Sequence, residues 1–89
     1  MTDEGIRTVL EVAAARARLP GAPRRRHIRE EAGLSQADMA KGLGVTRATI
    51  SRWERGDRTP SAARLVAYET LLARLARESA YSAESDPRG

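Results

Sequence analysis

The sequence has no cysteine and a single histidine among its 89 residues. Disulfides need paired thiols, and a structural zinc site takes cysteine or histidine ligands in larger number than this chain supplies. The composition therefore excludes a disulfide framework and a zinc-stabilised fold, and we expect no cofactor. A chain without disulfides is typical of a reducing compartment, so we expect a cytoplasmic protein.

Long apolar runs and aromatic residues are also scarce. The longest apolar stretches span only a few residues, as in 12–15, whereas a membrane helix needs about 20. One tryptophan, two tyrosines and no phenylalanine are too few for the base-stacking surface of an RNA-binding domain. With one histidine and no cysteine there is no recognisable pair of nucleophile and base, so the sequence argues against an enzyme. We expect no membrane contact either.

Arginine, in contrast, is abundant. Sixteen Lys and Arg residues against twelve Asp and Glu give a net charge of +4, and every cation except Lys41 is an arginine. The planar guanidinium binds a phosphate or a guanine edge through two hydrogen bonds. The surplus favours a polyanionic partner, although many soluble proteins carry a charge of this size without one.

The spacing of apolar and helix-breaking residues predicts an all-α bundle of about five short helices, and strand-like alternation is absent. Residues 1–19 contain an additional N-terminal helix, capped by Thr2 or Asp3. One face of this helix is apolar and carries Ile6, Val9, Leu10, Ala13 and Ala17. Pro20, Gly21 and Pro23 end it. A compact domain over residues 20–78 follows, with helices at 24–32, from 36 onward, at 47–55 and at 62–78, and we expect residues 79–89 to be a disordered tail.

The middle of this domain has the ingredients of a helix-turn-helix, in the segment LSQADMAKGLGVTRATISRWERG. Ser35 and Asp38 have the spacing of a capping box, and Gly44 occupies the turn, where a left-handed backbone is easiest without a Cβ. Ala40 is small where the two helices would cross. Apolar side chains would converge between them, from Met39, Leu43, Val45, Ile50 and Trp53. Two short helices joined by such a turn predict a helix-turn-helix.

The runs SQADMA, GLGVT, ISRWERG and TPS resemble the Xre family of regulators, also called the lambda Cro/cI-like repressor group, over about residues 24–76. The resemblance implies that residues 47–55 form a recognition helix that enters the DNA major groove. The sequence departs from the family at Gly42, where a helix-forming residue is usual, and in its additional N-terminal helix.

The resemblance also implies a set of DNA contacts. Base edges would be contacted by Arg47, Ala48 and Arg52, with Ser51 at the fringe. An arginine there would bind guanine, and Ala48 would touch a thymine methyl. The alternative is that the arginines are solvated and paired with Glu54 or Asp57. The DNA backbone would be contacted by Gln36, Thr46, Arg55 and Arg29, although Gln36 has the alternative of an ordinary exposed residue at a helix start. The charge of the cluster Arg24, Arg25 and Arg26 makes it a further candidate for the backbone.

The remaining matched positions are structural: Ala40, Gly44, Ile50, Trp53 and Glu54. The resemblance pairs Arg29 with Glu54 in a salt bridge that sets geometry. Trp53 has two interpretations, a core side chain or a partner of DNA. The cluster 24–26 also has two, because three cations at a helix N-terminus oppose the helix dipole. Either phosphate relieves this conflict, or the patch is solvated and offset by pairs such as Arg26 with Glu30.

The resulting hypothesis is a sequence-specific regulator that binds a double-stranded DNA operator, as a repressor of phage, prophage or plasmid type. The alternative is an antitoxin or adaptor that mainly binds a protein through the first or last helix and uses DNA binding for autoregulation. Apolar residues of the last helix are numerous enough to close the core and to pair with a second copy, so a homodimer and a monomer both remain open.

Overall fold

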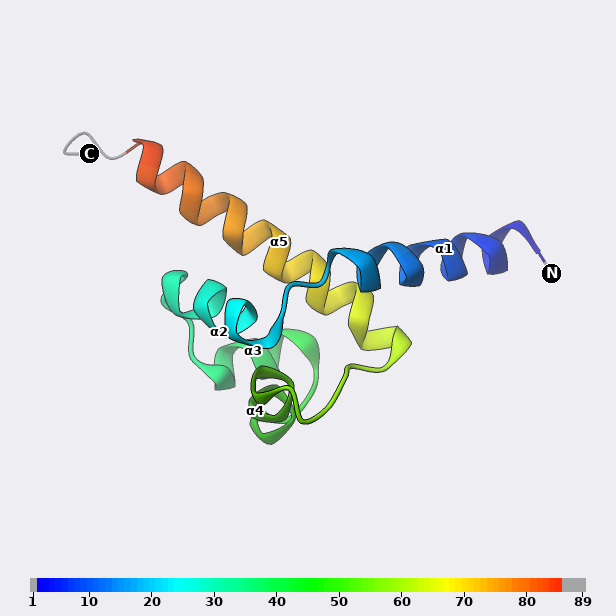
Figure 1. Ribbon diagram of the computed structural model, residues 1–89, viewed down its shortest axis with the longest axis horizontal. Helices are drawn as coiled ribbons and strands as arrows, with labels where there is room; N and C mark the ends of the chain where they lie inside the picture. The colour runs from blue at the N-terminus through cyan, green and yellow to red at the C-terminus, as the bar shows by residue number, and fades with distance from the viewer. Residues whose placement is uncertain (1, 86–89) are drawn as a thin grey trace.

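The computed structural model describes the backbone of residues 2–85 and the side chains of residues 2–80. This part of the chain contains five helices and no strand: α1 (Asp3–Arg18), α2 (Ala22–Glu31), α3 (Gln36–Leu43), α4 (Arg47–Arg55) and α5 (Ala62–Ser85). Figure 1 shows α5 as a long diagonal helix with α1 on one side and α2, α3 and α4 gathered on the other. The all-α fold predicted from the sequence is confirmed.

Local capping explains where the helices begin. The Thr2 hydroxyl accepts a hydrogen bond from the Gly5 N–H at 3.0 Å, and Thr46 caps α4 in the same way. Ser35 and Asp38 form both hydrogen bonds of a capping box at the start of α3. Each cap satisfies an N–H that has no acceptor within its helix, so short-range chemistry sets these boundaries.

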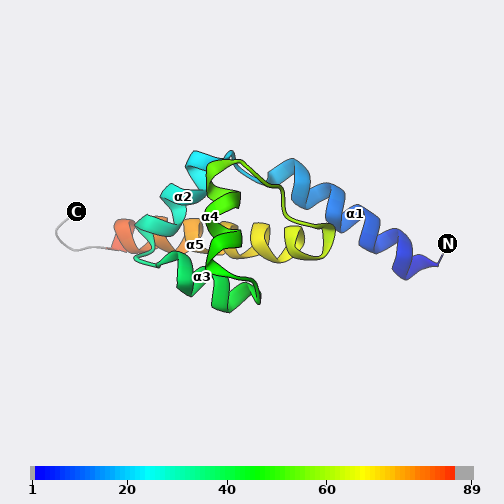
Figure 2. The ribbon, with the colours of Figure 1, turned by 90° about the horizontal axis from the view of Figure 1, so that it is seen from below.

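The core lies where α2, α3 and α4 pack on α5. Seen from below, α4 lies across α5, with α2 beside one of its ends and α3 at the other (Figure 2). The Trp53 and Tyr68 rings meet with centroids 4.8 Å apart and join α4 to α5. The buried core residues come from all four helices: Ile28, Met39, Ala40, Leu43, Ile50, Trp53, Tyr68 and Leu72.

The end of α5 differs from the expectation. A disordered tail was expected from Ser79 onward, but α5 continues past Glu78 to Ser85. Residues 79–85 contain neither glycine nor proline, and Pro87 is the next helix breaker, so nothing local ends the helix at 78. The rest of the expected tail, residues 86–89, lies outside the described residues.

The apolar face that the sequence indicates for α1 is exposed. The helix packs on α5 through the side that contains Ala15, which is buried, whereas the apolar face predicted from the sequence points outward. Ile6, Val9 and Leu10 are 43 %, 59 % and 63 % exposed. A chain of this length packed as a sphere would have a radius of gyration of about 12 Å. The observed 14.5 Å is larger because α1 and the end of α5 extend beyond the core.

Within residues 2–85, no helix combines the length and the apolar content that crossing a bilayer requires.

Candidate nucleic-acid interface

The helix α4 has one buried and one exposed face. Ile50, Trp53 and Glu54 are buried against the rest of the domain. Arg47, Ala48 and Arg52 are exposed and Ser51 is half-buried. Positions separated by four residues share one side of a helix, so the four expected base-contacting residues lie together on the open face.

The turn before α4 brings the start of α3 to the same surface. Gly44 ends α3 with φ of 68°, a left-handed conformation that favours glycine. The chain therefore reverses sharply, and a shallow hollow of about 330 Å³ forms between Gln36 and the residues Arg47, Ala48 and Ser51. The structure thus places Gln36 next to three of the four expected base-contacting residues, Arg47, Ala48 and Ser51.

A buried network holds α4 in this orientation. Arg29 donates two hydrogen bonds to the Glu54 carboxylate, from Nε at 2.6 Å and from Nη2 at 3.0 Å, and the Gln36 amide donates a third at 3.1 Å. Burial raises the pKa of Glu54, but the hydrogen bonds from Arg29 and Gln36 outweigh it and hold the pKa below its ordinary value. The same hydrogen bond to Glu54 raises the pKa of Arg29. Both groups are therefore charged at neutral pH.

This network limits which groups of Arg29 and Gln36 are free to contact DNA. The third guanidinium nitrogen of Arg29 donates to the Leu34 carbonyl at 2.8 Å, and the residue is only 8 % exposed. Arg29 therefore fixes α4 against α2 and the α2–α3 loop, and each of its nitrogens already has a protein acceptor. Gln36 remains partly accessible and begins α3, whose first N–H groups lack intrahelical acceptors.

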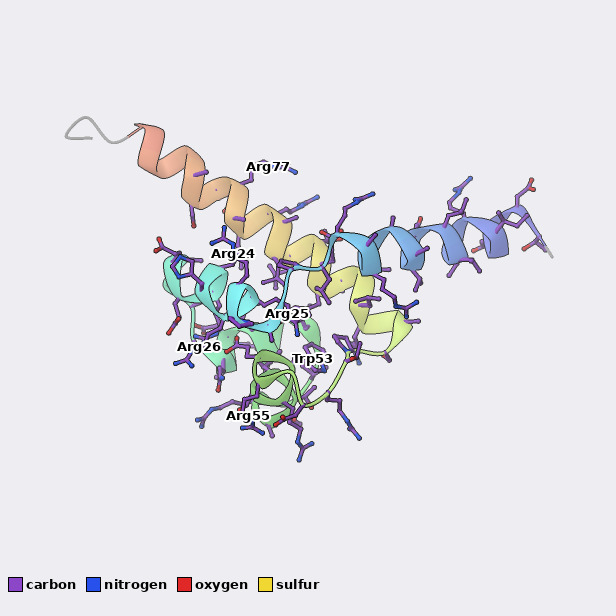
Figure 3. The ribbon with its side chains drawn as sticks, viewed as in Figure 1. Arg24, Arg25, Arg26, Trp53, Arg55 and Arg77 are labelled. Carbon is purple, nitrogen blue, oxygen red and sulfur yellow. The ribbon has the colours of Figure 1, made fainter. Side chains whose placement is uncertain are left out.

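The cluster 24–26 is not a single patch. Arg25 points into the protein, where Nη1 donates to the Pro20 carbonyl at 2.6 Å and Nη2 to the Trp53 carbonyl at 2.8 Å. Arg24 lines a groove beside the last turns of α5, and Arg26 lies 3.5 Å from Glu30 on the surface. Figure 3 shows the three side chains in different places. Successive helical residues are 100° apart, so adjacent arginines cannot share one direction.

Two further expected phosphate contacts lie at the ends of α4. Thr46 is exposed, and its hydroxyl accepts from the Thr49 N–H at 3.1 Å. Arg55 is exposed at the other end, where it contacts Asp57 at 2.8 Å and Ser51 at 2.9 Å. From the sequence, Arg47 or Arg52 was considered as the partner of Asp57. In the structure this partner is Arg55. The structure gives Arg47 and Arg52 no hydrogen bond or ion pair with other described residues.

Two residues of α5 support this site, and sequence reasoning missed one of them. Arg64 of α5 donates to the Leu43 carbonyl at 2.6 Å and so caps the end of α3. Tyr68 is fully buried beneath Trp53 and Arg25, and burial raises the pKa of its phenol. Tyr68 is one of the apolar residues by which the last helix was expected to close the core. No local signal indicated Arg64, because its acceptor lies more than twenty positions away in sequence.

Comparison with known proteins gives one match. Residues 26–76, which are more than half of the chain, match the model of a helix-turn-helix family. Searches of curated proteins and of solved structures found no significant match. The matched segment runs from α2 into α5 and includes both helices that frame the surface described above. The chain therefore belongs to the helix-turn-helix family of the Xre, or lambda Cro/cI-like, type, whose members are DNA-binding regulators.

Proposed function

We propose that this protein is a sequence-specific regulator that binds double-stranded DNA with α4 in the major groove and represses transcription by occupying an operator. The observation that carries the proposal is the two-sided character of α4. Its inner face is buried and tied to α2 and α3, while its outer face presents arginine, alanine and serine side chains with open space around them. A rigid helix with a free polar face is the element that reads bases in this type of domain.

Arg47 and Arg52 are the proposed base-reading side chains. Both are exposed, and neither is committed to a protein partner among the described residues. An arginine can donate two hydrogen bonds to O6 and N7 of guanine, which contributes about 1 to 3 kcal/mol of discrimination. Ala48 lies beside them, where its methyl group would contact thymine. The proposed half-site therefore contains at least one guanine.

Phosphate contacts are proposed on both sides of α4. Arg26 and Arg55 are exposed cations, and Thr46 and the free N–H groups at the start of α3 are neutral donors. Arg25 and Arg29 are left out of this set because their guanidinium groups are buried in hydrogen bonds with the protein. Arg24 faces the α5 groove and is a weaker candidate.

Selection from a random duplex library tests the proposal. The selected sequence and a scrambled duplex are then titrated by fluorescence anisotropy at two salt concentrations. Specific regulators bind their site about a thousandfold or more tighter than other DNA. Recovery of a motif with this preference supports the proposal, and weak binding that is equal for both duplexes contradicts it.

Arginine variants assign the contacts. We expect Arg52→Ala or Arg47→Ala to weaken binding to the selected duplex by about 1 to 3 kcal/mol and to relax the preference at one base pair. Arg77→Ala is the matched control, because it removes the same charge from an exposed position on α5 far from α4 (Figure 3). Equal weakening on every sequence would show that Arg47 and Arg52 do not read bases.

Repression is tested by in vitro transcription with the selected site placed across a promoter. Bound protein blocks access of polymerase without any chemistry, so we expect transcript to fall as occupancy rises. A rise in transcript would identify an activator and overturn the assignment as a repressor.

The second candidate is an antitoxin or adaptor whose main function is protein binding. It is favoured by the exposed apolar side chains of α1, which DNA recognition does not require. Failure to recover any motif, together with weak and uniformly salt-sensitive DNA binding, would replace the regulator with this candidate.

A further inference from the structure

The helix α1 has two apolar faces, and only one is covered. Ala15 is buried against α5, and Ala13 lies about 160° away from it around the helix at 100° per residue. Ala13 is exposed, together with Ile6, Leu10 and Ala17. DNA binding by α4 and packing on α5 leave this second face unused.

The spacing on this face matches a helix-helix seam. Ile6, Leu10, Ala13 and Ala17 follow one another at intervals of four, three and four residues, which is the spacing of the apolar positions in a coiled coil. The two large side chains lie in the N-terminal half and the two alanines in the C-terminal half. If two copies of α1 run antiparallel, Ile6 faces Ala17 and Leu10 faces Ala13 of the other copy, so each large residue meets a small one.

Charged residues are also distributed unequally between the two ends of α1. Asp3 and Glu4 lie in the first turn of α1, and Arg16 and Arg18 lie in the last. Arg18 is 3.7 Å from Glu69 of α5, so Arg16 is the basic residue of this end that has no ion pair among the described residues. An antiparallel pair places each acidic end beside the basic end of the other copy, whereas a parallel pair places like charges together. Exposed pairs add little affinity, but they select orientation. Size and charge are therefore self-complementary in one arrangement, which points to a second copy of this chain.

We propose that the face formed by Ile6, Leu10, Ala13 and Ala17 is a homodimer interface in which two α1 helices pack antiparallel. Sixteen residues make a helix of about 24 Å, and one pair of such helices buries less than the about 1,200 Å² of a standard interface. The dimer is accordingly weak and concentration-dependent. The interface does not involve α4, so the recognition helix stays open in both copies.

Sedimentation velocity of the full chain without DNA tests the interface. Measurements from about 1 to 300 µM cover the micromolar range in which a weak dimer would form. We expect a shift from monomer to dimer across this range. A wild-type chain that stays monomeric throughout would overturn the proposal, and so would a dimer that Ala13→Glu does not weaken.

Two glutamate substitutions form a matched pair. Ala13 and Ala73 are both exposed alanines inside helices, so each accepts a glutamate without loss of the core. Ala13→Glu places a charge in the seam and should lower the association constant by about tenfold or more. Ala73→Glu on α5 should leave association unchanged. A loss with Ala73→Glu alone would assign the dimer to α5 and overturn the proposal.

Asp3→Lys tests the orientation at low salt. In the antiparallel pair, the new lysine faces the basic end of the other copy, so association weakens. In a parallel pair, the same change would relieve repulsion between two acidic ends and strengthen association, which would contradict the arrangement.

DNA binding is measured separately, by anisotropy with the selected duplex. A monomer that still binds its site refutes only the interface, and a dimer without specific DNA binding refutes only the regulator.

Discussion

At the scale of single residues, the two glycines of the helix-turn-helix have opposite roles. Gly44 has φ of +68°, and a Cβ there would lie 3.2 Å from Nη1 of Arg64. Gly42 lies inside α3, and a Cβ there would meet nothing within 4 Å. The departure from the family at Gly42 therefore affects helix propensity alone, because α3 continues through this position to Leu43.

Alanine at each position should separate these roles. We expect Gly44→Ala to lower the free energy of unfolding by about 1 to 2 kcal/mol, because an L residue is strained in the left-handed region. Gly42→Ala should raise it by about 0.5 to 1 kcal/mol. Urea denaturation followed by circular dichroism measures both. Changes of the same sign at the two positions would contradict the assigned conformations.

Glu54 makes a pH-dependent contribution to stability. Its pKa is lower in the folded state than in the unfolded chain, because the hydrogen bonds from Arg29 and Gln36 outweigh burial. A lowered folded pKa stabilises the protein above the unfolded value of about 4.3, and this stability is lost as pH falls through the folded value.

Replacing the carboxylate removes this dependence. Glu54→Gln should be less stable than wild type at pH 7, because Arg29 is left buried without its counter-ion, and the difference should shrink towards pH 3. Urea denaturation between pH 3 and 7 measures it. Glu30→Gln is the control, since Glu30 pairs with Arg26 at an exposed site. A difference that does not change with pH would show that Glu54 is not charged in the folded state.

At the scale of elements, Arg25 joins segments that are far apart in the sequence. One nitrogen donates to Pro20 in the α1–α2 linker and another to Trp53 in the last turn of α4. Its guanidinium also lies 5.9 Å from the centre of the Tyr68 ring. A cation near a helix C-terminus compensates the partial negative charge of its carbonyl groups. Arg25 therefore ties the entry of α2 to the end of the recognition helix.

Loss of this side chain should destabilise the domain. We expect Arg25→Met to lower the free energy of unfolding by about 2 to 3 kcal/mol, because two hydrogen bonds from a charged group are lost. The Pro20 carbonyl loses its side-chain donor, and the Trp53 carbonyl keeps only the Gly56 N–H. Arg24→Met, one position away but exposed, should change it by less than about 0.5 kcal/mol. Thermal denaturation of the two variants makes the comparison. Equal effects would mean that the buried hydrogen bonds of Arg25 contribute no stability.

At the scale of the whole molecule, the positive charge predicts a salt-dependent affinity for DNA. The logarithm of the binding constant falls with the logarithm of salt concentration by about 0.9 for each neutralised phosphate. Arg26→Ala should therefore reduce the slope by about 1 and weaken binding to all sequences alike. Anisotropy titrations over a salt series measure the slope. An unchanged slope would remove Arg26 from the phosphate contacts, and Arg77→Ala is again the control.

The sequence by itself determined the five helices and the helix-turn-helix. Thr2, Ser35 and Thr46 cap helices through hydrogen bonds to residues three positions away, and Gly44 and Gly56 end helices in the left-handed conformation. These signals act over one helical turn, so composition and spacing suffice to predict them. The open face of α4 follows equally from helical spacing, because its apolar and polar residues are already separated in the sequence.

Only the tertiary structure decided which way Arg25 points, which side chain donates to the C-terminal end of α3 and which face of α1 is covered. Arg25 and Arg26 are adjacent arginines that no local pattern distinguishes, and the carbonyl that Arg64 caps lies 21 positions away in sequence. The helix α1 has apolar residues on two sides, so periodicity alone could not choose between Ala13 and Ala15. These outcomes depend on where a second element lies, and long-range packing, which no local pattern encodes, sets that position.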